Sequence, residues 1–181
     1  MIFLTQLLVL GALNMRPMSG YDIQNMLQEN EAERWSGVLV GSIYHALKKL
    51  EQNNFIEIDR IEHSGNRQKS IYRITELGKE HLKDLVYNSI ISSDVPYPLS
   101  FYAGLSFIEQ LDVERAIEAL RHQLTMLERE LVIVESGISI KEKHLSNGLS
   151  PLMSIVSNNM VNIIKQQINF VKDLLTNYNC N

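Results

Sequence analysis

The 181-residue sequence contains little cysteine, proline, glycine or tryptophan, with 1, 4, 9 and 1 residues respectively. These low counts exclude a disulfide scaffold, a collagen-like repeat and a disordered chain rich in proline and glycine. The single cysteine, Cys180, cannot form an internal disulfide, and its place beside the C-terminus does not suit a preorganised nucleophile. We therefore expect a globular protein of the reducing cytoplasm.

Long hydrophobic runs and an excess of basic charge are also missing. The apolar opening from Ile2 to Leu13 contains Thr5 and Gln6, has no basic residue ahead of it and is too short to span a bilayer. We interpret it as a buried first helix and expect no membrane partner. The net charge of −4 argues against indiscriminate coating of nucleic acid. Between residues 38 and 83, however, eight basic residues outnumber six acidic ones, which leaves a local basic patch.

The first third of the chain predicts three helices. Pro17 ends the opening helix, and Ser19 is placed to cap a second helix over about 20–29. A third helix is predicted over 38–53, where apolar residues recur at positions 43, 46, 47 and 50 and form one face. Its opposite face carries hydrogen-bond donors, a ring and two cations, namely Ser42, Tyr44, His45, Lys48, Lys49 and Gln52.

A β-hairpin and a fourth helix are predicted next. Residues 55–61 and 70–74 are rich in β-branched and aromatic side chains and bracket a polar, basic stretch over 63–69. Thr75 then begins a helix, with Leu77, Leu82, Leu85 and Val86 expected to face inward. Three helices, a hairpin and a helix, in this order, are typical of a winged helix-turn-helix. The predicted fold class is mainly α with a small β-hairpin wing.

The segment 87–99 loses periodicity and carries Pro96-Tyr97-Pro98, so we expect a linker between a domain over 1–86 and a helical domain over 100–181. A helix from the predicted cap Asp112 to the predicted stop Gly137 has apolar residues at alternating spacings of 4 and 3. This pattern favours a coiled-coil seam, with a long helix in a monomeric bundle as the alternative.

The last helix is predicted to begin at Ser150-Pro151, and its apolar face is too wide for one neighbour. A second copy of the chain is the economical way to cover it. We therefore predict a homodimer whose interface consists of Ile117, Leu120, Leu124, Leu127, Leu131, Ile164, Ile168, Val171 and Leu175.

Three segments resemble the signatures of the PadR family of transcriptional regulators: Ser19-Gly20-Tyr21-Asp22-Ile23, residues 41–50 (GSIYHALKKL) and residues 72–78 (YRITELG). The chain departs from the family at Leu39-Val40, where Ser-Pro is common, and Ser42 is the substitute cap. The resemblance implies that the third helix enters the DNA major groove and that the hairpin touches the backbone. Family members are often repressors released by small aromatic molecules. The C-terminal half is similar to that of the virulence-activator branch, in which it is the dimerisation domain.

Ser42, Tyr44 and His45 lie near the start of the third helix and are therefore the candidates for base readout. The candidates for backbone contact are Ser19, Tyr21, Lys48, Lys49, Asn66, Arg67 and Lys69. Other interpretations stay open: a packed ring for Tyr44, a solvated face for the lysines and an ordinary turn for the hairpin tip.

The five histidines lack metal-ligand spacing, and no phosphate loop, carboxylate pair or nucleophile elbow is visible. We expect no cofactor, no metal and no enzyme activity. The aromatic residues Trp35, Tyr97, Phe101, Tyr102 and Phe107 are interpreted as core rather than as a pocket for a small aromatic effector. The predicted function is a cytoplasmic homodimeric regulator, expected to be a repressor, on a palindromic operator in double-stranded DNA. The alternative is a winged-helix protein-interaction module whose DNA face is unused.

Overall fold

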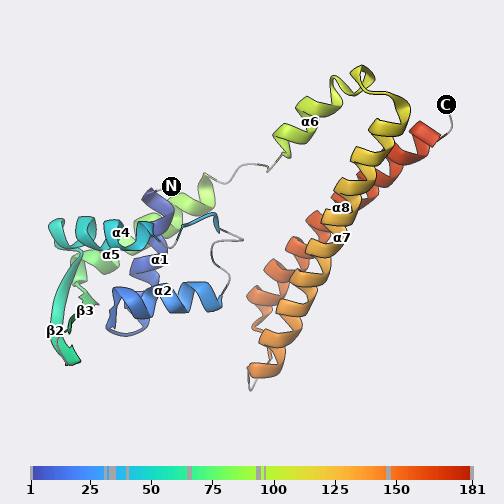
Figure 1. Cartoon of the computed structure of the whole chain (residues 1–181). Helices are drawn as coiled ribbons and strands as arrows, with labels where there is room; N and C mark the ends of the chain where they lie inside the picture. The colour runs from blue at the N-terminus through green and yellow to red at the C-terminus, as the bar shows by residue number, and fades with distance from the viewer. Residues whose placement is uncertain are drawn as a thin grey trace. The chain divides into compact units, whose positions relative to one another are not determined.

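The computed structural model describes residues 2–30, 32, 36–39, 41–64, 67–92, 95, 97–145 and 148–179. The chain forms two compact units, residues 1–96 and 97–181, and each is described by itself (Figure 1). Trp35, Asn66 and Cys180 lie outside the described residues, as does the side chain of Arg67.

The first unit contains the predicted order of three helices, a hairpin and a helix, together with one strand that was not predicted. Its described elements are α1 (Ile2–Met15), β1 (Met18–Ser19), α2 (Gly20–Glu29), α4 (Ser42–Gln52), β2 (Ile56–Ser64), β3 (Arg67–Ile74) and α5 (Glu76–Ile91). The three strands form an antiparallel sheet in the order β1-β3-β2, and β1 pairs Met18 with Tyr72 and Ser19 with Ile71. The winged helix-turn-helix fold is confirmed.

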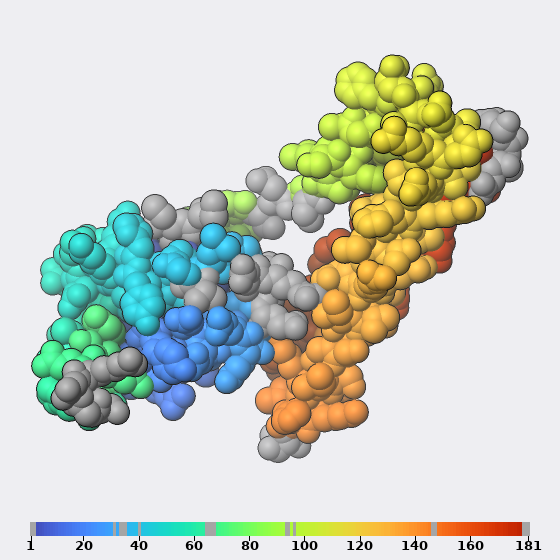
Figure 2. Space-filling model, in the orientation of Figure 1, coloured from blue at the N-terminus to red at the C-terminus, as the bar shows by residue number. Residues whose placement is uncertain are grey.

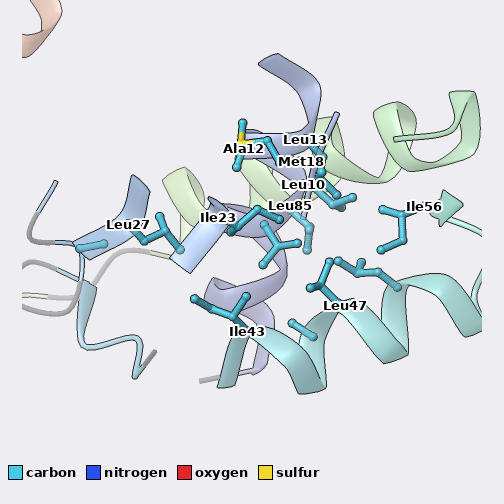
Figure 3. Close-up of a cluster of buried hydrophobic side chains, with 14 residues drawn as sticks. Leu10, Ala12, Leu13, Met18, Ile23, Leu27, Ile43, Leu47, Ile56 and Leu85 are labelled. Carbon is cyan, nitrogen blue, oxygen red and sulfur yellow. The ribbon is translucent and has the colours of Figure 1, made fainter. Parts of the chain in front are cut away.

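One hydrophobic core joins every helix of this unit. Leu10 of α1, Ile23 of α2 and Ile43 of α4 are fully buried, and they meet Ile56 of β2 and Leu85 of α5 (Figure 3). Because α1 is apolar on all sides, it packs against both α4 and α5. The core therefore fixes which face of α4 points to solvent.

Several predicted boundaries and orientations need correction. The third predicted helix begins at Ser42 rather than 38, and α5 continues to Ile91, so the first part of the predicted linker is helical. The strands extend to Ser64 and Arg67, which places Lys69 within β3. Leu77 and Val86 are exposed rather than inward. The buried face of α5 contains Gly78 and Leu85, and the next residue along a helix points about 100° away from its neighbour, which turns Leu77 and Val86 towards solvent.

The second unit is built on two long helices. It contains α6 (Leu99–Leu105), the 3-10 helix η1 (Ile108–Gln110), α7 (Val113–His144) and α8 (Pro151–Asn179). Lys165 pairs with Glu135 at 3.1 Å and Lys172 with Glu128 at 3.8 Å, so α7 and α8 are antiparallel neighbours (Figure 1).

The heptad residues predicted at the dimer interface lie on the faces where α7 and α8 of one chain pack. Leu120, Ile168 and Val171 are fully buried. The partly buried members of the set are Ile117, Leu124, Leu127, Leu131, Ile164 and Leu175. The seam therefore joins two helices of the same chain, and a contact of these residues with a second chain stays a prediction.

The helix ends of this unit test two predicted signals. The Met153 N–H donates to Ser150 Oγ at 3.3 Å, which confirms the predicted cap of α8. Gly137, in contrast, does not end α7, which continues to His144. The 4-and-3 pattern runs on through the half-buried Ile138 and Lys141, and packing of that seam outweighs the cost of about 1 kcal/mol for a glycine within a helix.

The aromatic residues that the sequence assigned to a core divide into two groups. Phe101 and Tyr102 of α6 meet Phe170 of α8 with ring centroids 6.1 and 5.9 Å apart. Tyr97 and Phe107 are exposed, which corrects their assignment, and Tyr102 is 38% exposed despite its ring contact. In the described part of the chain, no helix is long and apolar enough to cross a membrane, and no group of three or more His, Cys, Asp or Glu residues could hold a metal ion.

Candidate nucleic-acid interface

The solvent face of α4 is set by its burial pattern. Ile43, Ala46 and Leu50 are buried in the core. Tyr44, His45, Lys48 and Lys49 are exposed on the other side of the helix, which lies at the surface of the unit in Figure 2. Among the described residues, neither lysine forms an ion pair, so both charges are available to an anionic partner.

Ser42 occupies the edge of this face that adjoins α1. Its hydroxyl donates to the Leu39 carbonyl oxygen at 2.6 Å and lies 3.2 Å from Thr5 Oγ1. No side chain caps α4, whose N-cap residue is Gly41, so Ser42 does not substitute for the missing cap. A contact between Ser42 and a base stays a prediction, and its hydroxyl already has protein partners.

Tyr44 is packed on one side and open on the other. A methyl group at Gly20 of α2 would lie 2.8 Å from Cε1 of the Tyr44 ring, so the ring rests against the backbone of α2. The side chain is nevertheless 55% exposed. The ring is thus held in place by α2 while its free side and hydroxyl face solvent.

The N-terminus of α2 carries a complete capping box. The Asp22 N–H donates to Ser19 Oγ at 3.2 Å, and the Ser19 hydroxyl and N–H donate to Asp22 Oδ2 at 2.7 and 3.1 Å. Ser19 is buried and its hydroxyl is engaged in the cap, whereas Tyr21 is exposed. The Asp22 carboxylate therefore occupies the position at this helix N-terminus that suits an anion.

Lys69 of β3 reaches this same carboxylate. Its Nζ lies 3.0 Å from Oδ2 and 3.1 Å from Oδ1 of Asp22. Burial raises the pKa of Asp22, but hydrogen bonds from Ser19 and Lys69 outweigh it and hold the pKa below the usual value. The Asp22 carboxylate therefore competes with DNA phosphate for the predicted contact of Lys69.

The other described cations of the wing strands are also paired. Arg60 contacts Asp59 and Glu62, each at 2.8 Å, and Arg73 contacts Glu57 at 2.7 Å. The count of basic residues along the sequence did not reveal that acidic neighbours neutralise these arginines. The acidic residues of β2, Glu57, Asp59 and Glu62, were the signal in the sequence that could have shown it.

A groove of about 480 Å³ separates α4 from the wing. Its walls come from the start of α2, one side of α4 and β3. Its lining comprises Ser19, Gly20, Tyr21, Tyr44, Leu47, Lys48, Glu51, Gln68, Lys69, Ser70 and Tyr72. Sequence reasoning missed Glu51, Gln68 and Tyr72, because only the fold brings β3 next to α4.

Three helices followed by a β-hairpin wing and a further helix, with α4 exposed beside the wing, define a winged helix-turn-helix protein. Residues 9–84 match the model of the transcriptional regulator PadR-like family. The chain is also 30% identical over 124 residues to the negative transcriptional regulator PadR of Bacillus subtilis (strain 168), a match that spans 68% of this chain and 66%, just under two thirds, of that protein. Residues 9–84 thus form a domain of the PadR-like family of transcriptional regulators.

Solved structures share the fold over nearly the whole chain. Bacillus subtilis PadR in complex with operator DNA is 23% identical, with a TM-score of 0.74 and 96% of each chain covered. The protein smu.1604c of Streptococcus mutans UA159 is 26% identical, with a TM-score of 0.68 and 94% and 98% of the two chains covered. The Vibrio cholerae virulence activator AphA is 15% identical, with a TM-score of 0.68 and 97% and 98% covered. The predicted similarity to the virulence-activator branch is thus confirmed at the level of fold.

Proposed function

We propose that this protein is a sequence-specific DNA-binding regulator that represses transcription as a homodimer on a palindromic operator. The observation that carries the proposal is the solvent face of α4, where Lys48 and Lys49 have no acidic partner among the described residues and flank the exposed His45 and Tyr44. A helix of this kind fits the major groove, which is about 12 Å wide. The PadR-like domain and the fold shared with a PadR–operator complex support it.

The affinity part of the proposal is tested by salt dependence. Operator duplex is first selected from genomic fragments, and binding is then measured over a range of salt concentrations. Replacing Lys48 and Lys49 with alanine is expected to reduce the slope of log affinity against log salt by about 0.9 for each phosphate that the protein no longer neutralises. Lys143→Ala, at the end of α7 in the other unit, is the control with an unchanged slope. Wild-type protein that binds no duplex would favour the protein-interaction alternative.

Specificity is assigned to His45 and Tyr44, with Ser42 ranked below them because its hydroxyl is already bonded. His45→Ala and Tyr44→Phe are expected to weaken operator binding by about 1–3 kcal/mol while sparing random duplex. Equal losses on both duplexes would mean that these side chains meet only the backbone. Tyr21 and Arg67 are the proposed additional phosphate contacts, together with Ser19 and Asn66 in lower rank. Lys69 is not among them, because its ammonium group is paired with Asp22.

Dimerisation through the second unit is supported by an apolar stripe on α8, most of which is exposed to solvent in a single chain. Leu152, Val156, Ile163 and Phe170 recur on α8 at spacings of 4, 7 and 7. The aromatic rings of α6 contact Phe170, whereas the other three members are exposed. A second stripe of exposed residues, Met126, Ile133 and Ile140, recurs every seventh residue on α7. We propose that a second copy covers these stripes.

The dimer proposal is tested by sedimentation at micromolar concentration. Ile163→Glu is expected to shift the protein towards monomer, because an unpaired charge in a dry interface costs several kcal/mol. Asn162→Glu, at an exposed position next to it, is the matched control. A wild-type monomer would contradict the proposal. A dimer reads half-sites separated by about 10–10.5 base pairs or a multiple of this spacing.

We further propose that a small aromatic molecule releases the protein from its operator in the cytoplasm. The support is that Bacillus subtilis PadR, a protein that shares this fold, has been solved in complex with p-coumaric acid. Titration of the protein–operator complex with p-coumaric acid and related aromatic acids is expected to release the DNA. Unchanged binding across the series would count against an aromatic effector.

A further inference from the structure

We infer that Asp22 is a positioning residue for DNA binding, whose ion pair with Lys69 holds the β2–β3 wing against α2. The inference rests on the proposed DNA binding and deepens it. It gives an acidic residue at the DNA-binding face a favourable effect on affinity, although its charge repels phosphate.

Asp22 is rigidly held on the body of the unit. Its Oδ2 accepts two hydrogen bonds from Ser19, at 2.7 Å from the hydroxyl and 3.1 Å from the backbone N–H. Ser19 is itself buried and pairs with Ile71 in the β1–β3 ladder. The carboxylate therefore has a fixed position relative to both α2 and the base of the wing.

Lys69 connects the outer part of the wing to this fixed point. The pairing of β1 with β3 ends at Ile71, and beyond it β3 pairs only with β2. The Lys69–Asp22 ion pair joins this outer part of the wing to a helix, and it engages both carboxylate oxygens. Lys69 and its neighbours on β3 line the 480 Å³ groove together with α4, so an ion pair that holds β3 also holds part of the groove's lining.

The sign of one mutational effect separates this role from direct phosphate contact. If Lys69 binds phosphate, Asp22 competes for it, so removing the acidic charge strengthens DNA binding. If Asp22 positions the wing, removing the same charge weakens DNA binding because the outer wing is no longer held. A Coulombic effect on DNA alone also predicts strengthening, since one negative charge at the interface disappears.

The test uses Asp22→Asn, which keeps the side-chain shape and an oxygen for the Ser19 hydrogen bonds, and Lys69→Met, which leaves the cap of α2 untouched. Each variant is expected to weaken binding of a dimer to duplex by about two- to fivefold, with an unchanged salt slope. The double variant is expected to be no weaker than either single one, because both remove the same ion pair. Glu57→Gln, which removes an acid of β2 that pairs with Arg73, is the control without such a loss.

Tighter binding of Asp22→Asn, or a slope reduced by about 0.9 per phosphate in Lys69→Met, would overturn the inference while leaving the proposed DNA binding intact. Amide hydrogen exchange of residues 67–70 is measured without DNA as a second readout. Faster exchange in both variants, but not in Glu57→Gln, is expected. Unchanged exchange would overturn the inference as well. Failure of the wild-type protein to bind duplex would refute the proposed function, and the exchange data would still decide whether Asp22 holds the wing.

Discussion

The two units close their hydrophobic cores to different extents. In the first, Val9, Leu10, Ile23, Ile43 and Leu50 are completely shielded by helices and a sheet that surround them. In the second, the apolar side chains that are buried in the described part of the chain are only Ala116, Leu120, Val134, Ile168 and Val171. Two long helices meet along one seam and cannot also cover their outer faces. Comparison of the units therefore separates the residues that fold one chain from those that this chain alone leaves exposed.

The units also differ in how the sequence encodes them. The winged helix depends on single residues at set places, such as the caps Ser19 and Thr75 and the small residue Gly78. The helical unit depends on a repeated spacing of apolar residues along α7 and α8. Substitutions at single positions should therefore discriminate the two units.

The largest effect is expected at the seam of the second unit. Leu120→Ala removes a fully buried side chain between α7 and α8 and is expected to lower the free energy of unfolding by about 2–5 kcal/mol. Val132→Ala, on the exposed face of the same helix, is the control with little change. Chemical denaturation followed by circular dichroism measures both. A small loss in Leu120→Ala would mean that the seam repacks.

Gly78→Ala tests the first unit by adding an atom instead of removing one. The new methyl group would overlap the Phe55 carbonyl oxygen, which cannot move freely because it accepts a hydrogen bond from the Thr75 N–H at 3.1 Å. We expect a loss of about 1–3 kcal/mol from overpacking. Gly104→Ala, with open space around it on α6, should be tolerated. Equal thermal stability of the two variants would show that α5 shifts without cost.

Thr75→Ala is expected to have a smaller effect on the same junction. The Thr75 hydroxyl accepts from the Gly78 N–H at 3.0 Å and donates to the Asn54 carbonyl oxygen at 2.8 Å. Its loss should cost about 1 kcal/mol, the usual value of an N-cap. Thr75→Ser keeps the hydroxyl and should restore most of this stability in thermal denaturation.

The smallest effect concerns pH and the first unit alone. Burial raises the pKa of Asp22, whereas the hydrogen bonds from Ser19 and Lys69 lower it by more, so its folded-state pKa lies below the ordinary value of 3.8. The stabilisation from this carboxylate is therefore fully present above 3.8 and is lost as the pH falls through the folded-state pKa. The stability difference between wild type and Asp22→Asn should shrink across that range in urea unfolding. A difference independent of pH would refute the assignment.

Local signals predicted most of the first unit, because caps and periodicity act over few residues. The helix over 20–29, the hairpin and the start of α5 after Thr75 were all predicted from such signals. The strand β1 was missed because two residues carry no alternation, and it exists only through pairing with Tyr72 and Ile71. The exposure of Leu77 was missed for a similar reason, since Phe55 and Gly78 decide which side of α5 faces inward.

For the candidate site, the sequence identified the solvent face of α4 but not the state of its charges. Lys48 and Lys69 look alike in sequence, yet Lys69 is bound to Asp22, 47 positions earlier in the chain. In the second unit, heptad spacing indicated a seam but not which chain supplies the other side. The spacing of apolar residues indicates that one face of a helix is buried, but it does not say by which chain. Only the structure shows that α7 and α8 of the same chain bury these faces against each other.

The two-residue strand β1 has a consequence for synthesis on the ribosome. Its partners on β3 follow more than 50 residues later, and Leu85 of α5 completes the core later still. Helices α1, α2 and α4 therefore leave the exit tunnel before the elements that cover them, and closing so long a loop comes before any gain from its contacts. The DNA-binding unit consequently becomes resistant to proteases in one late step, once α5 has emerged, while the long helices of the second unit are still being made.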